Sequence, residues 1–229
     1  MREIVLDTET TGFDPKSGDR IVEIGCVELI NRMATGKTYH QYINPERDMP
    51  EEAFKVHGLG IDYLEKLPVI NDIMGDFLDF IGDADLVIHN AAFDMKFLNA
   101  ELGWLGYEQL PMSRAVDTLA IARAKFPGAQ VSLDALCRRY EIDNSSRSFH
   151  GALLDSELLA EVYLELTGGR QPGLELSAEE AEASSGAVKE EVTISRPVRE
   201  ARPHAPLDAE LAAHAAFLES ITEPIWNRE

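Results

Sequence analysis

The stretch that decides the fold is Ile4-Val-Leu-Asp7-Thr-Glu9-Thr-Thr-Gly12, near the start of a chain of 229 residues. Its apolar run predicts a buried strand that ends at two acids and a turn. Side chains two residues apart share a face of a strand, so we expect Asp7 and Glu9 to point toward one metal ion. Solvated acids at a strand end are the alternative, because Asp83-Ala-Asp85 shows the same spacing in a chain with 41 acidic residues.

A third acid follows a second short strand. Leu86-Val-Ile-His-Asn90 predicts this strand, and apolar residues then recur at helical spacing from Phe93 to Leu102. Asp94 is therefore expected in the first helical turn, just beyond the strand end. An acid at this position also favours the helix dipole, so a purely structural role is the alternative.

The third piece of sequence is His150-Gly-Ala-Leu-Leu-Asp155. On one helix, a separation of five residues would turn His150 and Asp155 about 140° apart. We therefore expect His150 on a polar loop, Gly151 as the joint, and Asp155 inside a helix that runs to about Thr167. A lone surface histidine is the alternative reading.

Together these pieces resemble the DEDDh family of 3′→5′ exonucleases, which carries Asp-x-Glu, Asp and His-x4-Asp in this order. All five signature positions are present, and the resemblance covers roughly residues 1–168. It includes Arg20-Ile-Val-Glu-Ile-Gly25 and Val56-His-Gly-Leu59. The resemblance implies an α/β, ribonuclease H-like fold, in which a mixed five-stranded sheet is flanked by helices, and it implies hydrolysis of phosphodiesters.

The family resemblance also implies a mechanism with two divalent metal ions. Asp7 would bridge both ions, Glu9 and Asp155 would complete the site that activates the water, and Asp94 would serve the second ion. Hard oxygen ligands favour Mg²⁺ or Mn²⁺ over zinc. His150 would be the general base, because an ordinary histidine pKa near 6.5 suits this role at neutral pH.

The terminal nucleotide has expected contacts as well. By the same resemblance its surroundings are Glu9, Thr10, Val56, His57 and Phe93. Phe93 is equally suited to the core, whereas His57 is expected at the rim of a pocket.

The charge of the first 168 residues limits how nucleic acid can bind. They carry a net charge of −14, whereas affinity for DNA ordinarily comes from Lys and Arg. Bound metals and local cations such as Lys96, Arg114 and Arg147 are therefore expected to attract the substrate. The intrinsic affinity for DNA is therefore expected to be weak, which favours attachment of the enzyme to a partner that is already bound to DNA.

Coarse patterning supports one globular domain, because early strands are followed by an alternation of strands and helices. Strands are expected near residues 3–8, 21–29, 37–43, 85–89 and 114–117, and helices near 51–57, 70–81, 93–102, 118–126, 132–140 and 152–166.

Cysteine usage and hydropathy bear on the compartment. Cys26 and Cys137 match neither a disulfide framework nor a metal-ligand spacing, so we expect buried thiols in a reducing environment. We expect no signal peptide, and the sequence contains no apolar run near 18 residues. We expect a soluble, cytoplasmic protein without a membrane partner.

The composition changes after residue 168. Residues 169–206 are rich in Ala, Glu, Ser and Pro, which predicts a flexible linker. Within it, Gln171-Pro-Gly-Leu174-Glu-Leu176 resembles the peptides by which bacterial replication proteins bind the sliding clamp. A mere spacer is the alternative.

Residues 207–229 are expected to form an amphipathic tail that needs a partner surface. Asp208 is the candidate N-cap of a helix to about Ser220, with Leu211 and Leu218 on one stripe. Packing of this helix on its own domain is the alternative. The ending around Trp226 resembles the polymerase-binding tail of epsilon subunits of bacterial DNA polymerase III. This resemblance implies the polymerase III alpha subunit as partner, with the sliding clamp and a small accessory subunit as further partners.

The combined resemblance implies an exodeoxyribonuclease that proofreads DNA during replication. It would remove mispaired 3′-terminal nucleotides as 5′-monophosphates, and fraying of the mismatched end would lower the cost of unpairing. An RNA-trimming exonuclease is one alternative, which would require a 2′-hydroxyl at the 3′ end. A chiefly structural subunit is the other, and it would function without Asp7 and Glu9.

Overall fold

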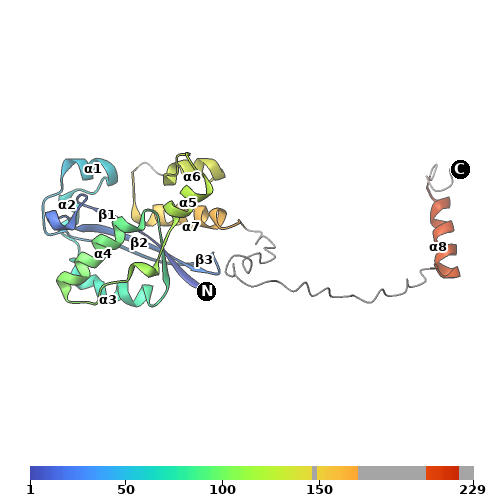
Figure 1. Cartoon of the computed structure of the whole chain (residues 1–229), viewed down its shortest axis with the longest axis horizontal. Helices are drawn as coiled ribbons and strands as arrows, with labels where there is room; N and C mark the ends of the chain where they lie inside the picture. The colour runs from blue at the N-terminus through green and yellow to red at the C-terminus, as the bar shows by residue number, and fades with distance from the viewer. Residues whose placement is uncertain (146–148, 170–204, 222–229) are drawn as a thin grey trace, which may run out of the picture. The chain divides into compact units, whose positions relative to one another are not determined.

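The computed structural model describes residues 1–145, 149–169 and 205–221. These residues fall in two units, within 1–176 and within 177–229, and each unit is described by itself. The first unit is built on a five-stranded sheet of order β3-β2-β1-β4-β5 (Figure 1). Its strands are β1 (Arg2–Thr10), β2 (Ile21–Ile30), β3 (Met33–Tyr42), β4 (Asp85–Ile88) and β5 (Ala115–Asp117).

The sheet is mixed, as predicted. β1 pairs antiparallel with β2 and parallel with β4, β2 pairs antiparallel with β3, and β4 pairs parallel with β5. β1 is therefore the central strand, and its register places Asp7 opposite Gly25 and Glu9 opposite Glu23. The ribonuclease H-like arrangement expected from the sequence is confirmed.

Most helices lie where the sequence predicted them. The predicted ranges 51–57, 70–81 and 152–166 match the observed bounds, whereas α4 extends further at both ends. The short elements η1, α2 and η2 were not predicted, because so few residues give no periodic signal. The helical elements of the first unit are η1 (Pro15–Ser17), α1 (Glu51–His57), α2 (Ile61–Leu64), α3 (Ile70–Ile81), α4 (Ala91–Leu105), η2 (Met112–Arg114), α5 (Thr118–Lys125), α6 (Leu133–Tyr140) and α7 (Ala152–Leu166).

Helices cover both faces of the sheet (Figure 1). Ile4 and Leu6 of β1 pack in one core with residues of α3 and α4, and Val5 packs in another with residues of α5, α6 and α7. Successive residues of β1 therefore face different helical layers. Asp7 and Glu9 share the α7 side with Val5, as the two-residue period predicted.

A glycine lets α7 approach the sheet next to Asp7. A Cβ on Gly25 would lie 2.2 Å from the carbonyl carbon of Ala152, the first residue of α7. The hydroxyl of Ser156 donates to the Gly25 carbonyl at 2.9 Å. This close contact brings Asp155 beside the end of β1.

Both cysteines are buried as thiols, as expected. Burial raises the pKa of the Cys26 thiol well above its ordinary value, and the nearby Asp7 adds to the shift. The thiol is therefore protonated and unreactive at neutral pH.

The second unit contains α8 (Asp208–Glu219) among its described residues. Its N-cap is Leu207, whose amide donates to the Glu210 carboxylate at 2.9 Å, so the prediction that Asp208 is the N-cap was wrong by one residue. Leu211 is exposed within this unit, and Leu218 is half-buried. Along the described ranges, the helices are all too short or too polar to cross a membrane.

The linker peptide and the end of the tail lie outside the described residues. This applies to Gln171, Leu174, Leu176 and Trp226, and to Arg147 in the loop before His150.

Candidate active site

The five signature residues line one cavity of about 670 Å³ at the carboxyl ends of β1 and β4. Four parts of the chain contribute them: β1 carries Asp7 and Glu9, α4 carries Asp94, the loop before α7 carries His150, and α7 itself carries Asp155. The structure thus brings together side chains that are far apart in the sequence. The five residues are Asp7, Glu9, Asp94, His150 and Asp155.

Three of these residues form a compact group of metal-ligand atoms. One ligand atom each from Glu9, His150 and Asp155 lies within 4.8 Å of the other two. Nδ1 of His150 is 3.4 Å from Oδ2 of Asp155. Asp155 is buried, whereas the His150 side chain is 48% exposed, so the imidazole faces both the carboxylates and solvent. This donor set fits a divalent cation.

Asp94 reaches the same cavity from the opposite helical layer. Its Oδ1 accepts the Thr8 amide at 3.1 Å and the Thr8 hydroxyl at 2.7 Å. Burial raises the pKa of Asp94 to about 7, although the Thr8 hydrogen bonds oppose the shift; Asp117 also raises it. A bound cation would favour the charged carboxylate, so this site too fits a metal.

The backbone before α4 is held by Asp117 at the end of β5. Asn90 has a positive φ of 70°, and its amide donates to Oδ1 of Asp117 at 3.2 Å. The same oxygen accepts the Leu119 amide at 2.9 Å. Asp117 thus ties the start of α4, and with it Asp94, to the start of α5.

His150 lies immediately before α7, as predicted. Gly151 is the N-cap, and its carbonyl accepts the Asp155 amide at 2.8 Å. The His150 amide donates to the Val56 carbonyl at 3.1 Å. The loop of His150 is therefore attached to α1 as well as to α7.

A second cavity of about 620 Å³ adjoins the first, and the two share Thr8, Glu9, Phe13 and Phe93. All five residues expected around the terminal nucleotide line it: Glu9, Thr10, Val56, His57 and Phe93. Phe93 lies 5.1 Å from the ring of Phe97, centroid to centroid, and packs against the core as well. Phe93 therefore lines the cavity and also packs against the core, while its contact with a nucleotide stays a prediction.

His57 is 5% exposed and forms part of the pocket wall, so the expectation of a rim position was wrong. Its Nδ1 accepts the Leu59 amide at 3.0 Å, which places the ring proton on Nε2. Burial lowers the pKa of His57 and outweighs the opposing effects of Glu23 and the Thr10 backbone. Among the described residues, no acceptor lies in hydrogen-bonding geometry to the buried Nε2–H.

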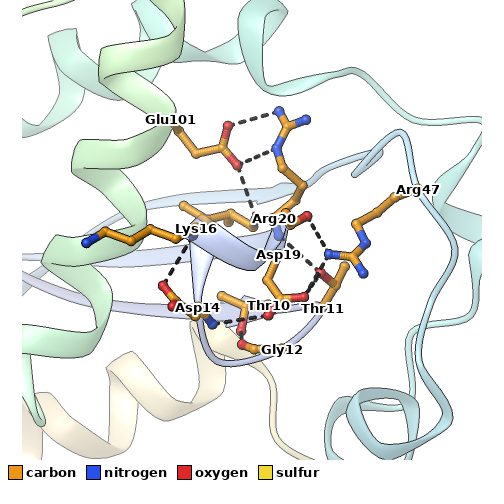
Figure 2. A network of polar contacts seen from close by, with 11 residues as sticks. Thr10, Thr11, Gly12, Asp14, Lys16, Asp19, Arg20, Arg47 and Glu101 are labelled. Atoms are coloured by element: carbon orange, nitrogen blue, oxygen red, sulfur yellow. Dashed lines mark hydrogen bonds and ion pairs between the residues drawn. The ribbon is translucent and has the colours of Figure 1, made fainter.

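The loop after β1 forms another wall of this pocket, and Asp19 anchors it (Figure 2). One carboxylate oxygen of Asp19 accepts the Asp14 amide at 3.1 Å, and the other pairs with Arg47 at 2.7 Å. A Cβ on Gly12 would lie 2.4 Å from Oδ2 of Asp19, so a larger residue there would force the Asp19 carboxylate out of its place. The sequence motif ending at Gly12 gave a signal for a turn but none for its partner.

The base of the loop is fixed by a buried ion pair (Figure 2). The Arg20 guanidinium binds both carboxylate oxygens of Glu101, at 2.8 and 2.9 Å. Glu101 is 1% exposed and also accepts the Ile21 amide at 3.3 Å. The pair therefore joins α4 to the start of β2.

Of the cations expected near the site, Lys96 lies there and Arg114 does not. Lys96 is close, because its ammonium donates to the Phe13 carbonyl at 2.6 Å in the pocket loop. Arg114 instead donates to the carbonyls of Gly82 and Ala84, before the opposite end of β4. Arg123 lines the metal cavity and was not singled out from the sequence.

Comparison with known proteins agrees with this geometry. The exonuclease family model (RNase_T) matches residues 4–163. DNA polymerase III subunit epsilon of Rickettsia felis is 48% identical, over 96% of this chain and 97% of the relative. The protein of the same name from Escherichia coli K12 is 45% identical, over 96% of this chain and 93% of the relative.

Solved structures show the same fold at low sequence identity. Exonuclease X in complex with 5′ overhanging duplex DNA is 22% identical, with a TM-score of 0.56 over 72% of this chain and 90% of that chain. The nuclease domain of 3′hExo, a DEDDh family member bound to rAMP, is 19% identical, with a TM-score of 0.61 over 72% of this chain and 90% of that chain.

Proposed function

The chain belongs to the exonuclease family and, within it, to the epsilon subunits of bacterial DNA polymerase III. From this membership we propose a role for each residue of the site. The activity is that of a 3′→5′ exonuclease that proofreads DNA during replication. The observation that carries the residue assignment is the single cavity lined by all five signature residues.

We infer that two divalent ions, Mg²⁺ or Mn²⁺, are held by Asp7, Glu9, Asp94 and Asp155. When bound, such ions lower the pKa of water and stabilise the attacking and leaving oxygens of a phosphodiester. The close ligand atoms of Glu9 and Asp155 support this assignment, as does the raised pKa of the buried Asp94. Thr8 orients Asp94 through two hydrogen bonds to one oxygen.

His150 accepts the proton of the attacking water in this proposal. Asp155 lies on the Nδ1 side of the ring, which leaves Nε2 as the basic nitrogen. The half-exposed imidazole then returns the proton to solvent after each turnover. His150→Ala is expected to lower turnover by a factor of about 10² to 10⁴. Wild-type turnover of this variant across pH 6 to 9 would exclude the role.

The second cavity receives the 3′-terminal nucleotide. Thr10, Val56 and Phe93 offer apolar contacts to a base and sugar, and the buried Nε2–H of His57 offers a donor. Because the side chains that contact the nucleotide need not read base edges, a frayed end enters whatever its base. The product is a 5′-monophosphate.

The tail holds the enzyme on the replication machinery in this proposal. Residues 207–229 bind the polymerase III alpha subunit, and residues 171–176 bind the sliding clamp; a small accessory subunit is a further partner. In this proposal the protein acts in the cytoplasm. Replacing Gln171, Leu174 and Leu176 by Ala tests the clamp site, because unchanged affinity for the clamp would refute it.

The experiment that tests the function is release of mononucleotides from 3′-labelled DNA, matched and mismatched, and from an RNA of the same sequence. Wild type is compared with Asp7→Ala, in Mg²⁺ and in chelator. We expect release from DNA that is faster at the mismatch and is lost in the variant and in chelator. Release from RNA alone would favour an RNA-trimming enzyme, and no release at all would favour a structural subunit.

A further inference from the structure

The loop that carries His150 is attached to the end of α1 through two neighbouring residues. The His150 amide donates to the Val56 carbonyl at 3.1 Å. The ring of Phe149 lies over Gly58, so closely that a Cβ on Gly58 would be 3.3 Å from Cγ of the ring. Phe149 and His150 therefore both contact the last residues of one helix.

Gly58 suits this contact for two reasons. Its φ is 73°, the left-handed conformation that ends α1, and its amide donates to the Phe54 carbonyl at 2.8 Å. It also has no side chain, so the ring of Phe149 can lie directly on the backbone. Any other residue would strain the turn and press against the ring.

Phe149 is poorly placed to stabilise the core. It is 57% exposed, although a phenylalanine stabilises a fold mainly through the surface that it buries. Together with Val56 and His150 it lines a third cavity, also of about 620 Å³ and distinct from the nucleotide pocket. His150 lines the metal cavity as well, so the two cavities adjoin. This location suggests work at the active site rather than in the interior.

We propose that Phe149 is a positioning residue, which holds the imidazole of His150 at the metal cavity by packing on Gly58. The proposal rests on the proposed role of His150 as general base. It also links two parts of the site, because α1 supplies Val56 and His57 to the nucleotide pocket. A nucleotide bound against Val56 and His57 would contact the same end of α1 that positions His150, the proposed general base.

Single-turnover and steady-state rates on mismatched DNA test this role with Phe149→Ala and Phe149→Leu. We expect Phe149→Ala to lower kcat at least tenfold with KM changed less than twofold, since small misplacement of a catalytic group is costly. Leucine, which retains an apolar contact, should restore most of kcat. In a His150→Ala background, Phe149→Ala should change kcat less than twofold further.

Gly58→Ala provides a second variant, with Gly106→Ala as its matched control. Both glycines end a helix with positive φ, at 73° and 79°, but no atom lies within 4 Å of a Cβ on Gly106. Both substitutions should lower the unfolding temperature, because an alanine strains either turn. Only Gly58→Ala should also lower kcat, at temperatures where both variants are folded.

Two outcomes would overturn the positioning role alone. One is an equal loss of kcat from Phe149→Ala with and without His150, and the other is a rise in KM at constant kcat, which indicates stacking of Phe149 on the substrate. Wild-type turnover of His150→Ala by itself would instead refute the proposed function of His150, and the positioning role with it.

Discussion

Gly25 of β2 lies against the backbone of Ala152, where α7 begins, with room for no more than a hydrogen. This contact sets the distance between Asp155 on α7 and Asp7, which lies opposite Gly25 on β1. The packing of one glycine therefore determines how close two of the proposed metal ligands come.

Gly25→Ala is expected to push the start of α7 away from the sheet. Overpacking of a well-packed interior costs about 1 to 3 kcal/mol of unfolding free energy. Mg²⁺-dependent release of nucleotides should fall more than tenfold, because Asp155 moves with the helix. Urea unfolding and the release assay measure the two effects. Gly75→Ala in α3 is the matched control, because a Cβ there meets nothing within 4 Å; a comparable loss of activity in this control would contradict the explanation.

Asp94 should make the metal-free protein less stable as pH rises. Its folded pKa of about 7 lies above the ordinary value of 3.8, so its favourable contribution is complete below pH 3.8 and is lost as pH rises through 7. Unfolding free energies in chelator, between pH 4 and 8, should show this loss in wild type and not in Asp94→Asn. Mg²⁺ should restore stability at pH 8 in wild type. The same pH dependence in the variant would exclude Asp94 as its source.

Glu101→Ala should loosen the loop that walls the nucleotide pocket. The substitution leaves Arg20 without its bidentate partner, which we expect to cost about 2 to 3 kcal/mol because the pair is mostly buried. KM for DNA should rise more than kcat falls. Glu51→Gln removes the exposed pair with Lys55 and should cost less than about 0.5 kcal/mol. Equal costs for the two substitutions would argue against a structural role of the buried pair.

The α8 helix offers a direct test of the polymerase contact. Leu211→Ser combined with Leu218→Ser should weaken binding to the alpha subunit at least tenfold, if these apolar side chains are anchors of the interface. Ala213→Ser lies about 200° around the helix from Leu211 and is the control. Calorimetry with the full chain distinguishes the two variants. Equal affinity of wild type and the double variant would place the contact elsewhere.

The sequence predicted those features that follow from local periodicity and from the spacing of residues along the chain. The two-residue period placed Asp7 and Glu9 on one face, and the spacing of five placed His150 outside the helix of Asp155. β3 began earlier than predicted, at Met33, because most of its residues are exposed and show no alternation of apolar and polar side chains.

Contacts between distant segments were beyond the reach of sequence patterns. No pattern around Asp19 predicted that its carboxylate would anchor the loop beside Gly12. Likewise, no pattern around Gly25 predicted its contact with the start of α7. The exposure of Arg123 to the metal cavity has the same origin, since it depends on how α5 packs beside β4. Such features require the three-dimensional arrangement of elements that local periodicity cannot supply.

The alternation along β1 makes residue count a requirement of the chemistry. Thr8 turns toward Asp94 in one layer, while Asp7 and Glu9 turn toward Asp155 in the other. Loss or gain of one residue in this strand would exchange the two sides and present acids where a hydroxyl is needed. A substitution in β1 away from Asp7, Thr8 and Glu9 therefore leaves the alternation intact, whereas an insertion or deletion inside the strand would displace all three side chains at once.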